Sequence, residues 1–312
     1  MNEVVSIASN AAITTATAPE AEPVPLTSVR APGGLRTLGR WSVSALRHPG
    51  LLLAGVFLFL LLLASLVPDW LSGVDPLLTS SHEALQAPGS AHWLGTDQNG
   101  RDVLARLIHG TGASLFIGLA ATAIALIIGI VLGLAAGLGR QWFDNAIMRV
   151  VDVVMAFPDL LLALVIIAFW GQGTVTLIIA VGVAGIPRFA RMVRAQTQLV
   201  RASAYIESAT TLGLPRFVVV LRHVLPNAIK PVLILGSISV GNNIGLAAAL
   251  SFLGFGAPPP APEWGGMLSI GRSYLINAPA LVIAPGVAIT LTVLSIAALG
   301  KALMRYSEGK PV

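Results

Sequence analysis

The chain has 312 residues, of which 55% are hydrophobic and only 11% are charged, and its mean hydropathy is +0.83. Soluble domains carry about 25% charged residues, so 19 Lys and Arg with 14 Asp and Glu cannot cover a water-facing surface of this size. The sequence contains no cysteine, which excludes disulfides, thiolate zinc sites, iron–sulfur clusters and a cysteine nucleophile. We therefore expect an all-α protein that lies in a lipid bilayer.

The N-terminal part precedes the first apolar run. Residues 1–34 are rich in Ala, Thr, Pro and Glu without a helical or strand period, which predicts a disordered cytoplasmic tail. Residues 35–49 alternate Leu or Trp with Arg, a pattern that fits a cytoplasmic segment on the membrane surface; a flexible basic linker fits equally well. The first apolar run lies behind about fifty residues, including Glu3, Glu20 and Glu22, which is too deep for a cleavable signal peptide with a short basic front, so we expect the run to be retained.

Six apolar runs follow along the chain. A helix needs about 20 mostly apolar residues to cross a ~30 Å hydrocarbon core, and these runs predict a six-helix transmembrane domain over residues 50–305, with 306–312 as a short cytoplasmic tail. The expected spans are 50–67, 114–138, 147–170, 174–186 with an extension toward 190, 231–255 and 281–299.

The positive charges orient these spans. With a cytoplasmic N-terminus, only Arg101, Arg106 and Arg272 fall outside, which satisfies the positive-inside rule and places both termini in the cytoplasm. The net charge of +5 then requires no nucleic-acid partner. The 16 residues on the inside are Arg30, Arg36, Arg40, Arg47, Arg140, Arg149, Arg188, Arg191, Arg194, Arg201, Arg216, Arg222, Lys230, Lys301, Arg305 and Lys310.

Motifs for catalysis and cofactor binding are missing. Neither Gly300-Lys301 nor Gly309-Lys310 has the leading glycine and trailing hydroxyl of a phosphate-binding loop, and neither H-E-x-x-H nor G-x-S-x-G occurs. The histidines lack ligand spacing, so we expect no metal, no cofactor and no enzyme activity in this chain. The stretch that ends at Asp102 lacks the later ligands of a calcium loop, and predicts a glycine turn with Asp102 capping the helix of the second span.

The loop 201–227, which we call the knob, reads as two short helices. Residues 204–212 are compatible with a helix, Gly213 suits a left-handed C-terminal cap, and Pro215 suits the first turn of a second helix. Apolar residues then recur at helical spacing (Phe217, Leu221, Val224 and Leu225) until Pro226-Asn227, where we expect the helix to break. From these residues alone, a docking site for another protein and an ordinary solvated hairpin are equally good interpretations.

The same residues resemble a family. Glu207-Ser208-Ala209, then Gly213, then His223 to Asn227, resemble the E-A-A-x-x-x-G loop of the membrane subunits of ABC importers, with Ser208 in place of an alanine. Upstream, Leu94-Gly95-Thr96-Asp97 with Gly100-Arg101-Asp102, and downstream, Ser251 to Gly256 with Glu263-Trp264-Gly265, are similar to the dipeptide, oligopeptide and nickel branch. The resemblance covers about residues 35–305.

The resemblance implies a type I ABC importer permease of the bacterial inner membrane that moves peptides by alternating access. Its implied partners are a second, homologous permease chain, two ABC ATPase subunits that hydrolyse the ATP, and a periplasmic or extracellular substrate-binding protein, with lipid around the spans. An ion-coupled secondary transporter and an intramembrane hydrolase are the alternatives. The residues implied in coupling to the ATPase are Tyr205, Glu207, Ser208, Ala209, Gly213, His223, Pro226 and Asn227.

Polar side chains inside the spans are costly in hydrocarbon and should face the helix bundle or a water-filled route. Asn242, Asn243 and Asp159 are therefore candidates for the translocation path, although hydrogen bonding between helices explains the two amides equally well. For Asp152, which lies three residues after Arg149, a local ion pair is the expected role.

Small residues recur every fourth position in two spans. Gly129, Gly133 and Gly137 in the second span, and Gly241 and Gly245 in the fifth, would let another helix approach closely. Internal packing and contact with a partner permease both remain open from the sequence.

Overall fold

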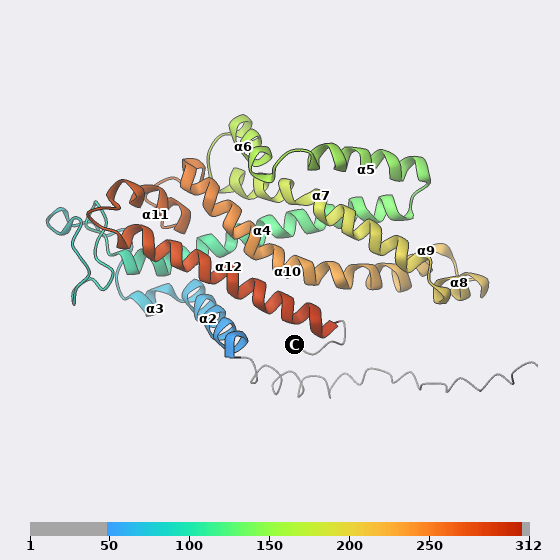
Figure 1. Ribbon diagram of the computed structural model, residues 1–312, viewed down its shortest axis with the longest axis horizontal. Helices are drawn as coiled ribbons and strands as arrows, with labels where there is room; N and C mark the ends of the chain where they lie inside the picture. The colour runs from blue at the N-terminus through green and yellow to red at the C-terminus, as the bar shows by residue number, and fades with distance from the viewer. Residues whose placement is uncertain (1–48, 308–312) are drawn as a thin grey trace, which may run out of the picture. The chain divides into compact units, whose positions relative to one another are not determined.

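The computed structural model describes residues 49–307, and within these residues it is built from helices and loops without strands (Figure 1). The expectations for residues 1–34, for most of 35–49 and for the last five residues of the chain lie outside this range. The elements are α2 (Pro49–Leu66), α3 (Pro68–Ser72), η1 (Ser81–Glu83), α4 (Val103–Leu138), α5 (Gln141–Met155), α6 (Asp159–Trp170), α7 (Thr174–Arg201), α8 (Ala204–Thr211), α9 (Arg216–Val219), η2 (Val220–Val224), α10 (Leu225–Leu250), η3 (Ser251–Phe255), α11 (Trp264–Gly271), η4 (Arg272–Tyr274) and α12 (Ala280–Ser307).

Long helices run lengthwise through the bundle in alternating directions. In Figure 1, α4, α7 and α12 run toward the end that carries α8 and α9, whereas α2 and α10 run the opposite way, toward α11. Five continuous helical segments among the described residues are long and apolar enough to cross a membrane, and α5 with α6 makes a sixth if the bent pair counts as one crossing. The helices extend beyond the expected spans, since α4 begins at Val103 and α7 continues to Arg201.

The third expected span is wrong as a single helix. Instead of one helix over 147–170, α5 ends at Met155, α6 begins at Asp159, and the two axes meet at 90°. Pro158 explains the break, because proline has no amide hydrogen for the helix ladder and disfavours helical geometry at the preceding residue, Phe157.

The expected break at Pro226-Asn227 is also wrong. The segment Arg216–Phe255 runs on as α9, η2, α10 and η3. The turn η2 is a π-helix, in which the Leu225 amide bonds to the Val220 carbonyl five residues back. Pro226 then lies in the first turn of α10, where a missing amide hydrogen is tolerated.

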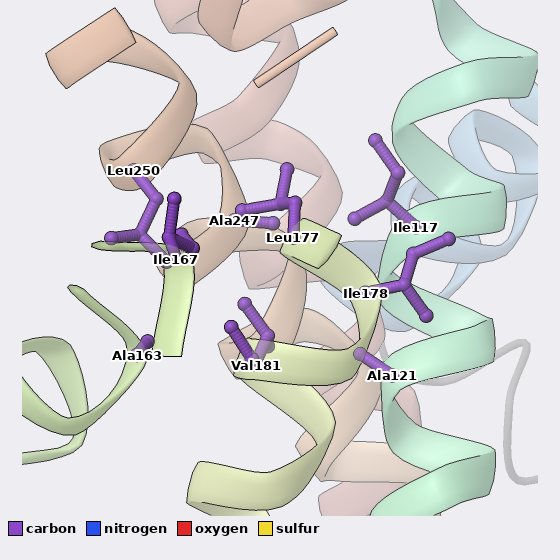
Figure 2. Packing of buried hydrophobic residues seen from close by; sticks show 10 residues of the cluster. Ile117, Ala121, Ala163, Ile167, Leu177, Ile178, Val181, Ala247 and Leu250 are labelled. Atoms are coloured by element: carbon purple, nitrogen blue, oxygen red, sulfur yellow. The ribbon is translucent and has the colours of Figure 1, made fainter. Parts of the chain in front are cut away.

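The largest cluster of buried apolar side chains joins four helices. Figure 2 shows Ile117 and Ala121 of α4, Leu177 and Val181 of α7, and Ala247 and Leu250 of α10 around it, together with Ala163 and Ile167 of α6. These side chains are small or branched, so the helix axes approach closely and the interior fills without polar atoms. The cluster holds α6 to the bundle at one end of the bent pair.

The glycine series of α4 packs inside the chain. A Cβ built on Gly133 would lie 2.5 Å from Val193 Cβ, and one on Gly137 would lie 2.7 Å from Thr197 Cβ, both on α7. Gly129 faces Phe189 in the same way, so all three glycines serve the α4–α7 contact rather than a partner chain. The structure decides the open question for this helix in favour of internal packing.

Capping and a buried arginine organise the end of the bundle opposite the knob. As expected, Asp102 caps α4, its Oδ1 accepting the Ala105 amide at 2.7 Å. Arg106, one turn further and only 4% exposed, donates to the carbonyls of Pro76 at 3.1 Å and Pro260 at 3.3 Å. This guanidinium ties two loops that are far apart in the sequence to the start of α4.

The short helix α11 is fixed by its own cap. Glu263 accepts the amides of Gly265 and Gly266, each at 2.8 Å, and burial raises the pKa of the Glu263 carboxyl while these two hydrogen bonds oppose the rise. Trp264 is fully buried, and its indole donates to the Leu107 carbonyl at 2.9 Å. The Glu-Trp-Gly motif is therefore a docking point of α11 on α4.

We expect Gly133→Ala to destabilise the protein, because the new Cβ would press on Val193 and on the Ala190 carbonyl. Overpacking of this kind costs about 1–3 kcal/mol, more than the helix propensity that alanine gains. Gly245→Ala is the matched control, since its Cβ would meet only Val293 Cγ2 at 4.0 Å. Thermal unfolding in detergent compares the two; equal melting temperatures would mean that the α4–α7 contact relaxes without cost.

Candidate functional site

The knob is a small helical unit with its own core. Ile206 and Ala209 on one face of α8 are buried against Val219 and Val224, the inward side chains of α9 and η2. These apolar residues face inward, whereas Glu207 and Ser208 on the other side of α8 are exposed. Of the residues implied in coupling, Ala209 thus packs inside the knob, and Glu207 and Ser208 lie on its surface.

Gly213 makes the turn between the two helices of the knob. Its φ of +80° is left-handed, and a Cβ there would meet nothing within 4 Å, so backbone conformation rather than space favours glycine. Pro215 follows as the residue immediately before α9, with a φ of −62°. The expected left-handed cap is confirmed.

Three predicted residues from opposite ends of the knob come together. The Asn227 side-chain amide donates to the Tyr205 hydroxyl at 3.2 Å and to the His223 carbonyl at 2.9 Å. The rings of Tyr205 and His223 meet edge to face with centroids 6.4 Å apart. These contacts tie α8 to the first turn of α10, and the residue before Asn227, Pro226, is exposed.

The knob presents apolar side chains outward. Leu212 is 83% exposed and Phe217 is 72% exposed, and Tyr205, Leu214 and Leu221 are also exposed. Sequence periodicity grouped Phe217 and Leu221 with Val224 on one stripe, yet only Val224 is buried. The spacing of four between Phe217 and Leu221 indicated a common face but not whether that face points inward.

A hollow lies beneath the knob, with a volume of about 550 Å³. The end of α4, the end of α7 and both knob helices contribute to it, and its lining includes Leu138, Glu207 and Arg216. Arg201 also lines it and donates to the Gly137 carbonyl at 2.6 Å, which fixes the last turn of α7 to the last turn of α4.

The two amides of α10 have different surroundings. Asn243 is 6% exposed and donates to the Thr122 hydroxyl of α4 at 2.9 Å, and that hydroxyl donates to the Gly118 carbonyl at 2.7 Å. Asn242 is exposed on another side of the helix. Asn243 therefore serves helix packing, whereas Asn242 is free to meet a cavity or a partner.

The acidic residues of α5 and α6 pair with arginines of α7. Asp159 accepts a hydrogen bond from Arg188 at 2.8 Å, and Asp152 accepts one from Arg191 at 2.5 Å. The expected pair of Asp152 with Arg149 is wrong, because the bent pair places Asp152 against α7 instead.

A third pair completes what we call the Asp–Arg ladder. Asp144 of α5 binds Arg194 through two nitrogens, with the Nη2 bond at 2.6 Å, and Gln198 donates to the same carboxylate at 3.3 Å. Sequence reasoning counted these arginines as loop residues. Their three-residue spacing directly after an apolar run was the signal that they continue the helix on one face. The ladder is Asp144–Arg194, Asp152–Arg191 and Asp159–Arg188.

Within residues 49–307, no group of three or more His, Asp and Glu side chains could hold a metal ion.

Comparisons with known proteins agree on one family. Residues 129–310 match the model of the family described as "Binding-protein-dependent transport system inner membrane component". The glutathione transport system permease protein GsiD of Pectobacterium atrosepticum is 41% identical over 80% of this chain and 83% of its own length. The dipeptide transport system permease protein DppC of Alkalihalophilus pseudofirmus is 40% identical over 73% of this chain and 77% of its own.

Solved structures share the fold. A chain of the MetNI methionine ABC transporter in an inward-facing conformation aligns with a TM-score of 0.53 at 19% identity, covering 64% of this chain and 95% of that one. A chain of an amino acid ABC transporter aligns with a TM-score of 0.52 at 18% identity, covering 64% and 94%. The helical bundle thus has the fold of type I ABC importer permeases, and the chain belongs to the binding-protein-dependent transport system inner membrane components as a multi-pass permease subunit.

Proposed function

We propose that this chain imports di- or oligopeptides as one of two permease chains in an ATP-driven complex. Relatives named for glutathione and dipeptide transport support a peptide substrate. Two ATPase subunits would bind on the cytoplasmic side, and a substrate-binding protein would deliver peptide from outside. The permease would open alternately to either side of the membrane.

The observation that carries the proposal is the outward-facing surface of the knob. Leu212 and Phe217 expose large apolar side chains, which marks a surface for protein contact. Glu207 lies on the exposed face of α8 and can form charged hydrogen bonds at the rim of such a contact. We therefore assign the knob as the ATPase docking part.

Helix continuity gives the knob a mechanical role. Since α9 continues through η2 into α10, a displacement of α9 is carried along one helical segment from Arg216 to Phe255. An equilibrium between two conformations shifts only if a partner binds them differently. An ATPase pair that closes on ATP would supply that difference through the knob.

We propose that the translocation path runs along the exposed side of α10. Asn242 is the strongest of the three path candidates, because it is exposed and lies within a spanning helix, about two turns before the end of α10. Asn243 and Asp159 each have a partner inside the chain, so they would act on the path indirectly, by fixing the positions of the helices that line it.

The ion-coupled alternative has less support. A secondary transporter needs ionisable groups near the midplane, and each Asp of the described helices α5 and α6 is engaged by an arginine of α7. ATP-driven transport needs no such free carboxylate in this chain.

We further propose that both termini are cytoplasmic. The positive-inside distribution supports this orientation. The helix directions agree with it, because α12 runs toward the knob end and α2 runs away from it. Residues 50–305 would then form the transmembrane domain, with one cytoplasmic tail before it and another after it in the sequence.

We expect Glu207→Lys and Gly213→Trp to leave insertion intact and to uncouple transport, because reversed charge or added bulk on the docking surface weakens ATPase binding by about 1–3 kcal/mol. Copurification of the ATPase and uptake into proteoliposomes measure the effect. Gly73→Trp is the matched control, since Gly73 also has a left-handed φ and open space but caps α3. Normal copurification with full uptake in both knob variants would refute the docking role.

Topology is tested with reporter fusions at six positions. Because the positive charges are concentrated on one side, the reporters should separate into two groups of three. A reporter after Leu214 that reads periplasmic would overturn both the orientation and the docking role. The expected periplasmic positions are Gly73, Gly171 and Pro260, and the expected cytoplasmic positions are Arg140, Leu214 and Ser307.

The two amides of α10 should separate packing from transport. Asn243→Leu removes the hydrogen bond to Thr122, worth about 0.6 kcal/mol on average in membranes, and should lower the melting temperature slightly. Asn242→Leu should leave the melting temperature unchanged and reduce peptide uptake and peptide-stimulated ATP hydrolysis, because apolar bulk alters a wet path. Wild-type uptake in Asn242→Leu would place the path elsewhere.

A further inference from the structure

The bent pair is held to α7 unequally along its length. The α6 helix contributes Ala163 and Ile167 to the largest apolar cluster. In α5, by contrast, all of whose residues the structure describes, Val151 is the only buried apolar side chain. Apolar burial therefore fixes α6, and the attachment of α5 must depend on other contacts.

The Asp–Arg ladder supplies those contacts. Its three arginines recur every third residue on α7, which places them along one side of that helix. Their partners follow in reverse order along α5 and α6, so the two segments are joined as antiparallel elements. Two of the pairs flank the 90° break, with Asp152 before it and Asp159 after it.

The pairs differ in exposure. The Asp144 side chain is 11% exposed and accepts hydrogen bonds from Arg194 and Gln198, which makes this pair a fixed anchor. The pairs of Asp152 and Asp159 are about half exposed in the isolated chain. Opening either pair would leave two opposite charges without a partner, and pairs that belong to a network contribute more than isolated ones, so we expect both pairs to stay closed while the protein changes conformation.

This geometry has a consequence for motion. The bent pair cannot slide along α7 or swing away from it without separating at least one Asp from its Arg. At its C-terminal end, α7 passes through Ala202 and Ser203 directly into α8 of the knob. A displacement of the knob that moves α7 therefore moves α5 and α6 as well.

We propose that the Asp–Arg ladder is a strut that makes α5, α6 and α7 one rigid body, so that Asp152, Asp159, Arg188 and Arg191 are positioning residues for transport. The inference rests on the proposed role of the knob as the ATPase docking part. It assigns to these side chains the transmission of knob movement to α6 rather than contact with the substrate.

Charge changes within one pair test the strut. In the complete complex, Asp152→Asn and Arg191→Gln should each assemble and hydrolyse ATP but reduce uptake per ATP by about tenfold, since one charge is left unpaired. The swap Asp152→Arg with Arg191→Asp should restore most of the uptake. Arg149→Gln is the matched control, an exposed arginine of α5 outside the ladder, and it should transport normally. The strut is wrong if both single variants take up peptide normally. It is also wrong if the single variants lose uptake or assembly and the swap does not restore it.

The cysteine-free sequence permits a direct distance measurement. Spin labels at Leu199→Cys, near the end of α7, and at Val165→Cys on α6 occupy exposed positions. The distance between the two labels should be the same in the nucleotide-free and the ATP-bound complex. In the Arg191→Gln background, this distance should differ between the two states. The reference pair, Leu199→Cys with Ile283→Cys on α12, should change its distance between the two states. A shift between Leu199 and Val165 as large as that of the reference pair would contradict rigid-body motion.

The Gly213→Trp variant separates the two proposals. If it and Glu207→Lys both bind the ATPase and transport normally, the docking role of the knob fails, and the distance between α6 and α7 still reports on the ladder. If it uncouples transport while both single ladder variants transport normally, only the strut fails.

Discussion

The close contact between α4 and α7 is the constraint on which the rest of this structure depends. Three glycines on α4 remove the side chains that would separate the helices, and Val193 and Thr197 of α7 occupy the space. Interhelical attraction in a membrane comes mainly from van der Waals packing, which requires close approach. Because this contact fixes α7, it also fixes the positions from which the knob and the Asp–Arg ladder project.

The two ends of the bundle differ in the interactions that their side chains make. At the end opposite the knob, a buried polar side chain joins two separate loops: Arg106 donates hydrogen bonds to the carbonyls of Pro76 and Pro260. At the knob end, Leu212 and Phe217 are left exposed. Buried hydrogen bonds tie the loops of one end to α4, whereas exposed apolar surface makes the other end a place for protein contact.

The ladder and the knob meet on α7. Single exposed ion pairs contribute little to stability, and several pairs in one network contribute more. In this chain, they join α5, in which Val151 is the only buried apolar side chain, to the helix that leads into the knob. Docking and rearrangement of the spans are thereby linked through one element.

The sequence by itself determined the membrane class, the family, the positions of most spans, the cap at Asp102 and the left-handed turn at Gly213, because apolar length, capping and glycine geometry are local properties. Only the tertiary structure decided which face of a helix points inward. Phe217 shares the spacing of a buried stripe yet is exposed, and Asp152 has Arg149 nearby in sequence yet pairs with Arg191. Two prolines also behave differently: the helix breaks with a 90° bend at Pro158, whereas at Pro226 it continues after a π-helical turn. The reason is physical: what a side chain meets, and whether a helix continues past a proline, depend on neighbours that only the folded chain brings together.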